Sequence, residues 1–139
     1  MRIPAAAILG LFLAATIEAG PRSDYLLHCG GCHLENGAGN PPEVPDLRRD
    51  IDWLAGSIEG RSYLTRVPGA SQVPVSDARL AAILNWILDT YYPDGTEVQS
   101  FTGAEVGRTR RQPLYDPLAA RAALVAREAT AGNERPPES

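Results

Sequence analysis

Apolar residues recur at helical spacing in the stretch that follows Ser76-Asp77. The recurring positions are Leu80, Ile83, Leu84, Ile87, Leu88 and Tyr91. Residues spaced three and four apart share one face of an α-helix. Ser and Asp satisfy the free N–H groups of a first turn, and Pro93-Asp94-Gly95 ends the run. The pattern therefore predicts a helix that buries this face.

Shorter elements are predicted before this helix. They are a helix capped by Ser23 or Asp24 that continues through residue 27, helices over 50–54 and 58–67, and loops over 36–45 and 70–74. The helix over 58–67 should end before Pro68-Gly69, because a residue that precedes proline avoids the helical conformation. No stretch alternates in the manner of a strand, so the expected fold class is all-α.

Two further helices are predicted near the C-terminus. Thr102 and Glu105 form a capping box that opens a short basic helix to residue 111, and Asp116-Pro117 opens an alanine-rich helix to about residue 129. The second helix has a narrow apolar face made of Leu114, Leu118, Ala122 and Val125. This face can either pack back on the rest of the chain or dock on a partner protein.

The chain is expected to divide into four parts. Met1, Arg2 and the apolar run to Ile17 resemble a secretory signal, with Ala19 as a cleavage candidate. An uncleaved anchor is the alternative, although the run is shorter than the ~20 residues that a spanning helix needs. The parts are a signal peptide (1–19), one helical domain (20–95), a C-terminal helical extension (96–130) and a disordered tail (131–139).

Composition limits the possible partners. The chain contains no lysine, and its 13 arginines against 17 acidic residues give a net charge of −4. An acidic protein of this kind is a poor partner for nucleic acid and for an anionic membrane. Without the leader, about 120 residues remain, which is enough for one domain with a single core.

One segment specifies a chemistry, and it is Cys29-Gly30-Gly31-Cys32-His33. The pattern C-x-x-C-H is the attachment site of c-type haem. One helical turn places both thiols on the same side of the backbone, where they can add to two vinyl groups along one porphyrin edge. His33 then becomes the proximal iron ligand. Because this haem is attached outside the bacterial cytoplasm, motif and leader together predict a periplasmic protein.

Two cysteines at this spacing can also serve a zinc site, a redox-active dithiol or a disulfide, but the sequence supports each of these less well than haem attachment. A structural zinc site needs four ligands, and Cys29, Cys32, His28 and His33 crowd into a single turn. A redox-active dithiol expects a βαβ neighbourhood, which is not apparent here. A local disulfide is the remaining alternative. Covalent haem c, one per chain, is the expected cofactor.

In the order of its motifs, the segment 24–92 resembles a small class I cytochrome c. The haem motif lies on a first helix, a Gly/Pro loop contains Pro45-Asp46-Leu47, Val67-Pro68-Gly69 makes a turn, and Ser76-Asp77 opens the last helix. The resemblance implies that the first and last helices cross, so that Tyr25 and Leu26 meet Leu84, Trp86 or Ile87. It also implies that the carbonyl of Pro45, or less directly of Pro41 or Pro42, accepts a hydrogen bond from His33.

The chain departs from that family at the sixth iron ligand. Class I cytochromes usually supply a methionine from the loop before the last helix, whereas the only methionine here is Met1, and no histidine follows His33. Three outcomes stay open: a weak ligand from Gln72 or Ser71, a phenolate from Tyr63, or a site that holds water or nothing. Each outcome lowers the reduction potential relative to a His/Met cytochrome.

Four side chains are candidates to hold the haem propionates, because arginine matches carboxylate geometry and a buried propionate needs a donor. They are Trp53, Arg61, Tyr63 and Arg66.

The expected function is that of a one-electron carrier between a dehydrogenase or other redox donor and a downstream acceptor such as an oxidase or another cytochrome. The alternative is a haem protein with an open distal site that binds NO, CO or peroxide as a sensor or scavenger. Peroxidase catalysis is not expected, since the chain has no distal histidine.

Overall fold

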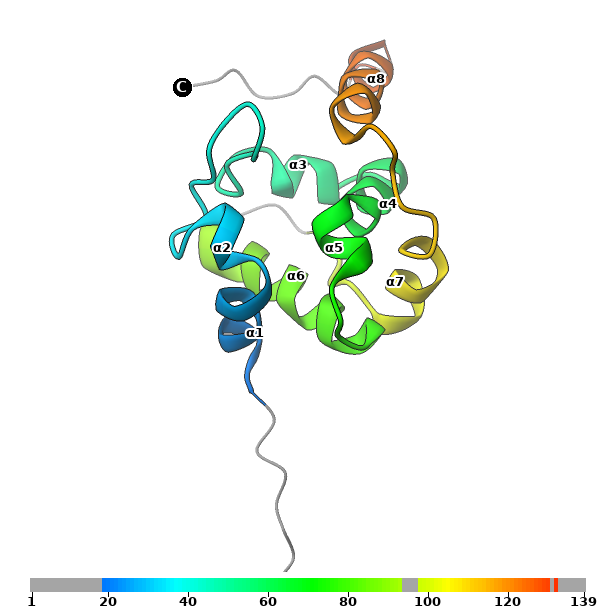
Figure 1. The fold of residues 1–139 in the computed structure, drawn as a ribbon. Coiled ribbons are helices and arrows are strands. Elements are labelled where there is room, and N and C mark those ends of the chain that lie inside the picture. Colours follow the sequence, from blue (N-terminus) through cyan, green and yellow to red (C-terminus); the bar gives the residue numbers. More distant parts are fainter. Residues whose placement is uncertain (1–18, 94–97, 131, 133–139) are drawn as a thin grey trace, which may run out of the picture.

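The computed structural model describes residues 19–93, 98–130 and 132, and their regular secondary structure consists of helices joined by loops (Figure 1). The helices are α1 (Pro21–His28), α2 (Gly30–His33), α3 (Ile51–Ala55), α4 (Ile58–Arg66), α5 (Pro68–Gln72), α6 (Asp77–Tyr91), α7 (Gly103–Thr109) and α8 (Pro117–Thr130). Within the described residues, β pairing is limited to an isolated bridge between Asn40 and Val44. The all-α prediction is therefore confirmed for this part of the chain.

The predicted ends of the chain fall almost wholly outside the description. Of the expected signal peptide (1–19) only Ala19 is described, and of the expected tail (131–139) only Gly132. Among the helices that the structure does describe, none combines the length and apolar character needed to cross a membrane.

Helix α6 follows its sequence pattern closely. The Ser76 hydroxyl accepts a hydrogen bond from the Arg79 N–H at 3.2 Å and caps the first turn. Helix α1 packs against it, and the rings of Tyr25 and Trp86 lie 4.9 Å apart, as the crossing of the two helices predicted. Tyr25 is completely buried, and its hydroxyl donates to the Leu34 carbonyl at 2.7 Å. The ring contact joins α1 to α6, and the bond to Leu34 joins α1 to the residue that follows α2.

Helix α1 begins earlier than predicted. It starts at Pro21, whose fixed backbone angle suits a first helical position, and Gly20 precedes it as N-cap. Asp24, expected as a possible cap, lies inside the helix, where it is buried and pairs with Arg79 of α6. The carboxylate therefore joins two helices rather than closing the end of one.

The segment before α6 is more regular than the predicted loop over 70–74. It contains α5, a helix of five residues that begins at Pro68. Pro68-Gly69 was predicted only to end the preceding helix, although proline is also favoured where a new helix starts. The loop prediction was therefore wrong for residues 70–72.

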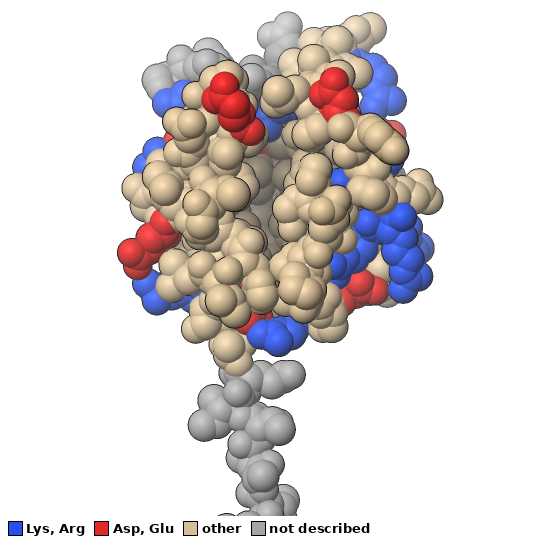
Figure 2. All heavy atoms as spheres, in the orientation of Figure 1, with Lys and Arg blue, Asp and Glu red and all other residues tan. Residues whose placement is uncertain are grey.

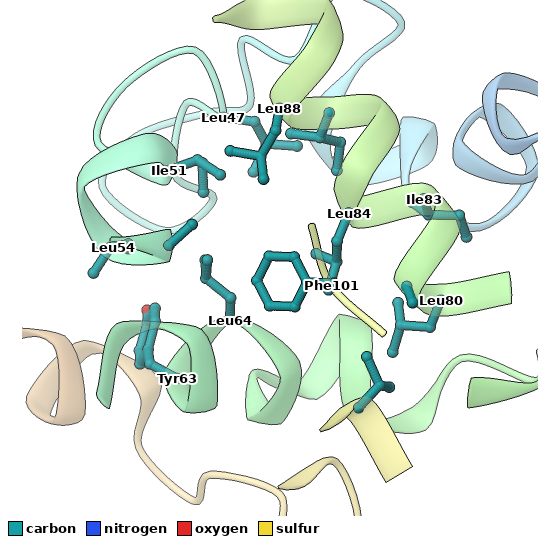
Figure 3. Close-up of a cluster of buried hydrophobic side chains, with 14 of the residues drawn as sticks. Leu47, Ile51, Leu54, Tyr63, Leu64, Leu80, Ile83, Leu84, Leu88 and Phe101 are labelled. Carbon is teal, nitrogen blue, oxygen red and sulfur yellow. The ribbon is translucent and has the colours of Figure 1, made fainter. Parts of the chain in front are cut away.

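The C-terminal extension completes the hydrophobic core. Phe101, Val106 and Leu124 are each less than 5% exposed and belong to the same buried cluster as the helices before residue 93. In Figure 3 the Phe101 ring lies between Leu64 of α4 and Leu84 of α6. Of the two uses left open for the extension, packing back on the chain is the one observed.

Polar contacts fasten the extension at several points. The Arg61 guanidinium binds the Glu105 carboxylate through two bonds of 2.6 and 2.8 Å, and it lies over the Phe101 ring. Arg110 is buried and donates to the carbonyls of Val73 and Val75 at 2.6 and 3.0 Å. Bidentate and charge-assisted bonds of this kind fix geometry as well as adding stability. Arg110, at the C-terminal end of α7, thus fixes the segment between α5 and α6.

The apolar face predicted for the last helix is rotated from the one that packs. Leu124 is the buried residue of α8, whereas Leu118 is half exposed and Ala122 is exposed. The Arg121 guanidinium, on the same side as Leu124, forms an ion pair of 2.6 Å with Asp50. The contacts of α8 with α4 and the ion pair with Asp50 determine which face of α8 is turned inward. The apolar pattern of the helix alone contains neither of these contacts.

The Arg61–Glu105 pair predicts a pH dependence. The guanidinium of Arg61 lowers the pKa of Glu105 below its ordinary 4.5, against the opposing effect of burial. A group with a lowered folded-state pKa contributes stability that is present at neutral pH and is lost as the pH falls through that value. We therefore expect Glu105→Gln to cost about 2 kcal/mol at pH 7. The difference from wild type should shrink as the pH falls below 4.5.

Urea denaturation of both proteins between pH 7 and pH 3 measures this effect. Glu59→Gln, at an exposed position of α4, is the matched control and should follow wild type at every pH. A Glu105→Gln difference that stays constant over the whole range would contradict the role assigned to the ion pair.

Candidate cofactor cavity

A cleft runs into the middle of the molecule, with α2 on one side and α5 on the other (Figures 1 and 2). Most side chains along its rim are neither acidic nor basic, and acidic groups flank its upper end (Figure 2). The cavity inside has a volume of about 340 Å³ and is lined by α1, α2, the loop 43–47, α3, α4, α5, α6 and the start of α8. This volume lies within the range of roughly 300–1,000 Å³ typical of ligand and cofactor sites.

Both cysteines of the motif border this cavity. Cys29 lies between α1 and α2, and Cys32 lies one turn further on in α2, so the two thiols reach the same wall. No disulfide joins them. Burial, followed by the charges of Asp24 and Cys32, raises the pKa of the Cys29 thiol to about 11. Dithiol redox sites instead lower the pKa of the attacking cysteine to about 3.5–7.5. The environment is therefore unlike that of a catalytic dithiol.

His33 presents one ring nitrogen to the backbone and leaves the other available. Its Nδ1 lies 3.0 Å from the carbonyl oxygen of Pro45, and His33 also lines the cavity. A carbonyl can only accept, so Nδ1 carries the proton and Nε2 keeps its lone pair. Burial lowers the pKa of His33, and the bond to Pro45 opposes this effect. The ring is therefore oriented so that Nε2 can ligate a metal, with Pro45 as the acceptor that the resemblance implied.

The loop that carries Pro45 depends on a glycine. Gly39 has a φ of +61°, and a Cβ built there would lie 2.5 Å from the Val44 oxygen and 2.6 Å from the Pro45 oxygen. Only glycine adopts this conformation readily beside such close backbone atoms. Gly39 therefore allows the loop to fold back so that the Pro45 carbonyl faces His33.

We expect Gly39→Ala to destabilise the protein by about 1–3 kcal/mol, because the new methyl group must displace the Pro45 carbonyl from a strained backbone position. Thermal denaturation measures the loss. Gly31→Ala is the matched control, since no atom lies within 4 Å of its built Cβ and its φ is not in the left-handed region. Equal melting temperatures for the two variants would contradict this account of the loop.

The wall across from the motif offers one polar side chain at helix α4. Tyr63 lines the cavity there, followed by Leu64 of the same helix and by Ala70 and Val73 from the segment that leads to α6. Burial raises the pKa of Tyr63, while the neighbouring Arg121 opposes the rise by its charge and by hydrogen bonding. Of the three residues named as candidates for the sixth iron ligand, Tyr63 is the one that borders the cavity.

Gln72 does not border the cavity, and neither does Ser71. Gln72 is the last residue of α5, and the Ser71 carbonyl is 3.4 Å from the buried Arg110 guanidinium. Because Arg110 also holds the carbonyls of Val73 and Val75, this segment is fixed in place. The structure does not bring the predicted Gln72 ligand to the site.

Arg61, Arg66 and Trp53, which were propionate candidates, also lie outside the cavity lining. Arg61 forms an ion pair with Glu105, and Arg66 donates a hydrogen bond to the Gln112 carbonyl at 2.6 Å. Their partners come from the C-terminal extension, 44 and 46 positions along the chain. The Trp53 indole nitrogen is buried without a hydrogen-bond partner among the described residues.

Among the described residues, the arginine that does line the cavity is Arg121, which was not among the predicted site residues. It comes from α8, one turn beyond Pro117. Arg121 lies three residues before the buried Leu124, so the two side chains share one face of α8. This spacing would have indicated that Arg121 points inward only if the packed face of α8 had been known. The C-terminal extension thus supplies part of the cavity wall.

Comparison with known proteins leaves the family open. A scan against protein-family models found no match for this chain, and a search of curated proteins found none either. Over the residues that the structure describes, no group of three or more His, Cys, Asp or Glu side chains is placed to hold a metal ion. Function is therefore inferred from the motif and the cavity.

Proposed function

We propose that the protein is a mono-haem c-type cytochrome of the class I kind that carries one electron at a time. The observation that carries this proposal is the arrangement of the motif. Cys29, Cys32 and His33 line a single apolar cavity, and the Pro45 carbonyl lies 3.0 Å from Nδ1 of His33. A c-type haem needs two thiols at one wall and an oriented imidazole beside them.

The residues present fit this group. Thioether bonds from Cys29 and Cys32 would hold the haem, His33 would ligate its iron, and the iron would supply the one-electron chemistry. The bond to Pro45 orients the imidazole and raises its basicity. Apolar side chains from α3 to α6, among them Ile51, Leu80 and Ile83, line the cavity and would give a bound haem surroundings of low dielectric. A low local dielectric of this kind is one of the properties that set a reduction potential.

The open cleft supports an electron carrier in a second way. Electron transfer needs a cofactor edge close to the surface and a face on which a partner can dock. The cleft reaches the surface between α2 and α5 (Figure 2), and Leu27 and Leu34, on either side of the haem motif, are exposed apolar side chains. We propose a periplasmic redox protein as the partner, either a dehydrogenase, an oxidase or another cytochrome.

A second function is favoured by one specific observation. Gln72 lies outside the cavity, and on the α4–α5 wall only Tyr63 could approach the iron with a polar atom. An iron without a firm sixth ligand can bind a small molecule such as NO or CO. The alternative proposal is therefore a sensor or scavenger of such ligands, with the same haem attachment.

Optical spectra of the purified holoprotein, ferric and ferrous, with and without CO, separate the two functions. A carrier whose sixth position is filled is expected to stay low-spin in both states and to ignore CO. A ferrous protein that is high-spin and changes at once with CO has an open position, which would contradict the carrier with a filled site and favour ligand binding. Tyr63→Phe, which removes the candidate phenolate, should open the site if Tyr63 fills it.

A further inference from the structure

Arg121 occupies an unusual place for a charged side chain. It is the only arginine that lines the cavity among the described residues, and its side chain is 18% exposed. It reaches the site from α8, which packs on α4. A charge in an apolar wall is costly unless it is paired, so its partners indicate what it does there.

Asp50 uses only part of the hydrogen-bonding capacity of the Arg121 guanidinium. One terminal nitrogen of Arg121 donates to Asp50, 2.6 Å away, and the Asp50 side chain is 8% exposed. The Tyr63 phenol lies beside the same guanidinium. A guanidinium carries five N–H donors in a planar fork, and the bonds to Asp50 and Tyr63 leave donors that can serve a further acceptor. Asp50 therefore orients Arg121 without exhausting it.

The position of Arg121 relative to the motif identifies a fitting acceptor. A haem carries its two vinyl groups on one side of the ring and its two propionate carboxylates on the other. Cys29 and Cys32 would fix the vinyl side near α1 and α2, and Figure 1 shows α8 at the far end of the molecule from α1. A ring tethered in this way directs its carboxylates away from α1. Arginine matches a carboxylate in shape and charge.

We propose that Arg121 binds a haem propionate, so that the C-terminal extension closes the cavity at its carboxylate end. This inference rests on the proposed haem attachment. It gives α8 a purpose beyond packing, because the helix brings a cation to a cavity whose other arginine candidates, Arg61 and Arg66, are turned away from it. Glu43 is an acidic side chain that lines the cavity. Asp50, next to the cavity residue Ile51, is paired with Arg121.

Infrared difference spectroscopy tests the contact directly. Haem labelled with ¹³C at its propionate carboxyls is incorporated during expression, and the labelled carboxylate bands are compared between wild type, Arg121→Leu and Arg121→Lys. We expect a shift of one labelled band in Arg121→Leu and a smaller shift in Arg121→Lys, because lysine keeps the charge but lacks the fork. The midpoint potential should also fall in Arg121→Leu, since a positive charge near the iron disfavours the ferric state.

Arg127→Leu is the matched control, because Arg127 is an exposed position of the same helix, and it should leave the labelled bands unchanged. If Arg121→Leu does not fold, Arg121→Lys still decides the question. Unchanged labelled bands in a haem-bearing variant would overturn this inference alone. A shift of the bound-CO stretching band without any change in the carboxylate bands would also overturn it and would place Arg121 at the iron ligand. A wild-type protein without covalent haem would instead overturn the proposed function.

Discussion

Replacing Cys29 and Cys32 together with alanine is expected to leave a chain that no longer melts cooperatively. Both side chains line the cavity, and without them no thioether bond can retain a haem there. The cavity would then be empty or filled with water against apolar walls. The fold is expected to depend on the group that fills this space.

The size of the cavity gives the magnitude. At about 24 cal/mol for each Å³ of unfilled volume, a cavity of 340 Å³ costs at most about 8 kcal/mol. The total stability of a domain is about 5–15 kcal/mol, so the loss is comparable to the whole. Water that enters through the cleft reduces this cost but forms few hydrogen bonds with such a lining.

Circular dichroism and a calorimetric scan of wild type and of the double variant, prepared in parallel, measure the effect. Gly31→Ala keeps the motif intact within the same turn and is expected to retain a sharp transition. A double variant without haem that unfolds cooperatively near the wild-type temperature would contradict the dependence of the core on a cofactor.

Ending the chain at residue 97 is expected to have the second large effect. The truncation removes Phe101, Val106 and Leu124 from the shared core. Burial of a large apolar side chain contributes about 1.5–3 kcal/mol, so the loss of all three removes roughly 5–9 kcal/mol. Arg61 also loses its ion pair with Glu105 and its bonds to the Gln99 and Ser100 carbonyls.

The truncated chain is compared with one that ends at Gly132, which keeps every described helix and should melt like the full chain. Thermal denaturation of the haem-bearing proteins is the measurement. We expect the short chain to be degraded or to melt far below the control. An unchanged melting temperature would mean that the helices before residue 93 form a complete domain and that the extension is an accessory.

The sequence predicted the elements whose signals are local. Helix α6 carries its cap at Ser76, its apolar spacing and its proline stop within about 20 residues, and the capping box at Thr102 opened α7 as expected. Pro68 was misinterpreted because one residue type marks both the end of α4 and the start of α5. The motif at Cys29 and the acceptor at Pro45 were predicted from spacing and resemblance, and the structure places both at the cavity.

The direction of the arginines could not be predicted. Arg61 pairs with Glu105, 44 positions away, and Arg121 pairs with Asp50, 71 positions away. Which arginine enters the cavity depends on how α7 and α8 pack, and that packing is a property of the whole core. Sequence patterns report the spacing along one helix, whereas these contacts join separate helices. For this reason Arg61 was named as a candidate and Arg121 was not.

The central claim is covalent haem attachment, and mass spectrometry of the exported protein under denaturing conditions tests it most directly. The protein is produced in a host that attaches haem in its periplasm, with the Cys29→Ala, Cys32→Ala double variant as control. We predict that the wild-type chain keeps one haem after denaturation and extraction with acidified solvent, while the double variant has the mass of the bare chain. A wild-type chain that loses its colour on extraction, or that never carries haem, would contradict the account.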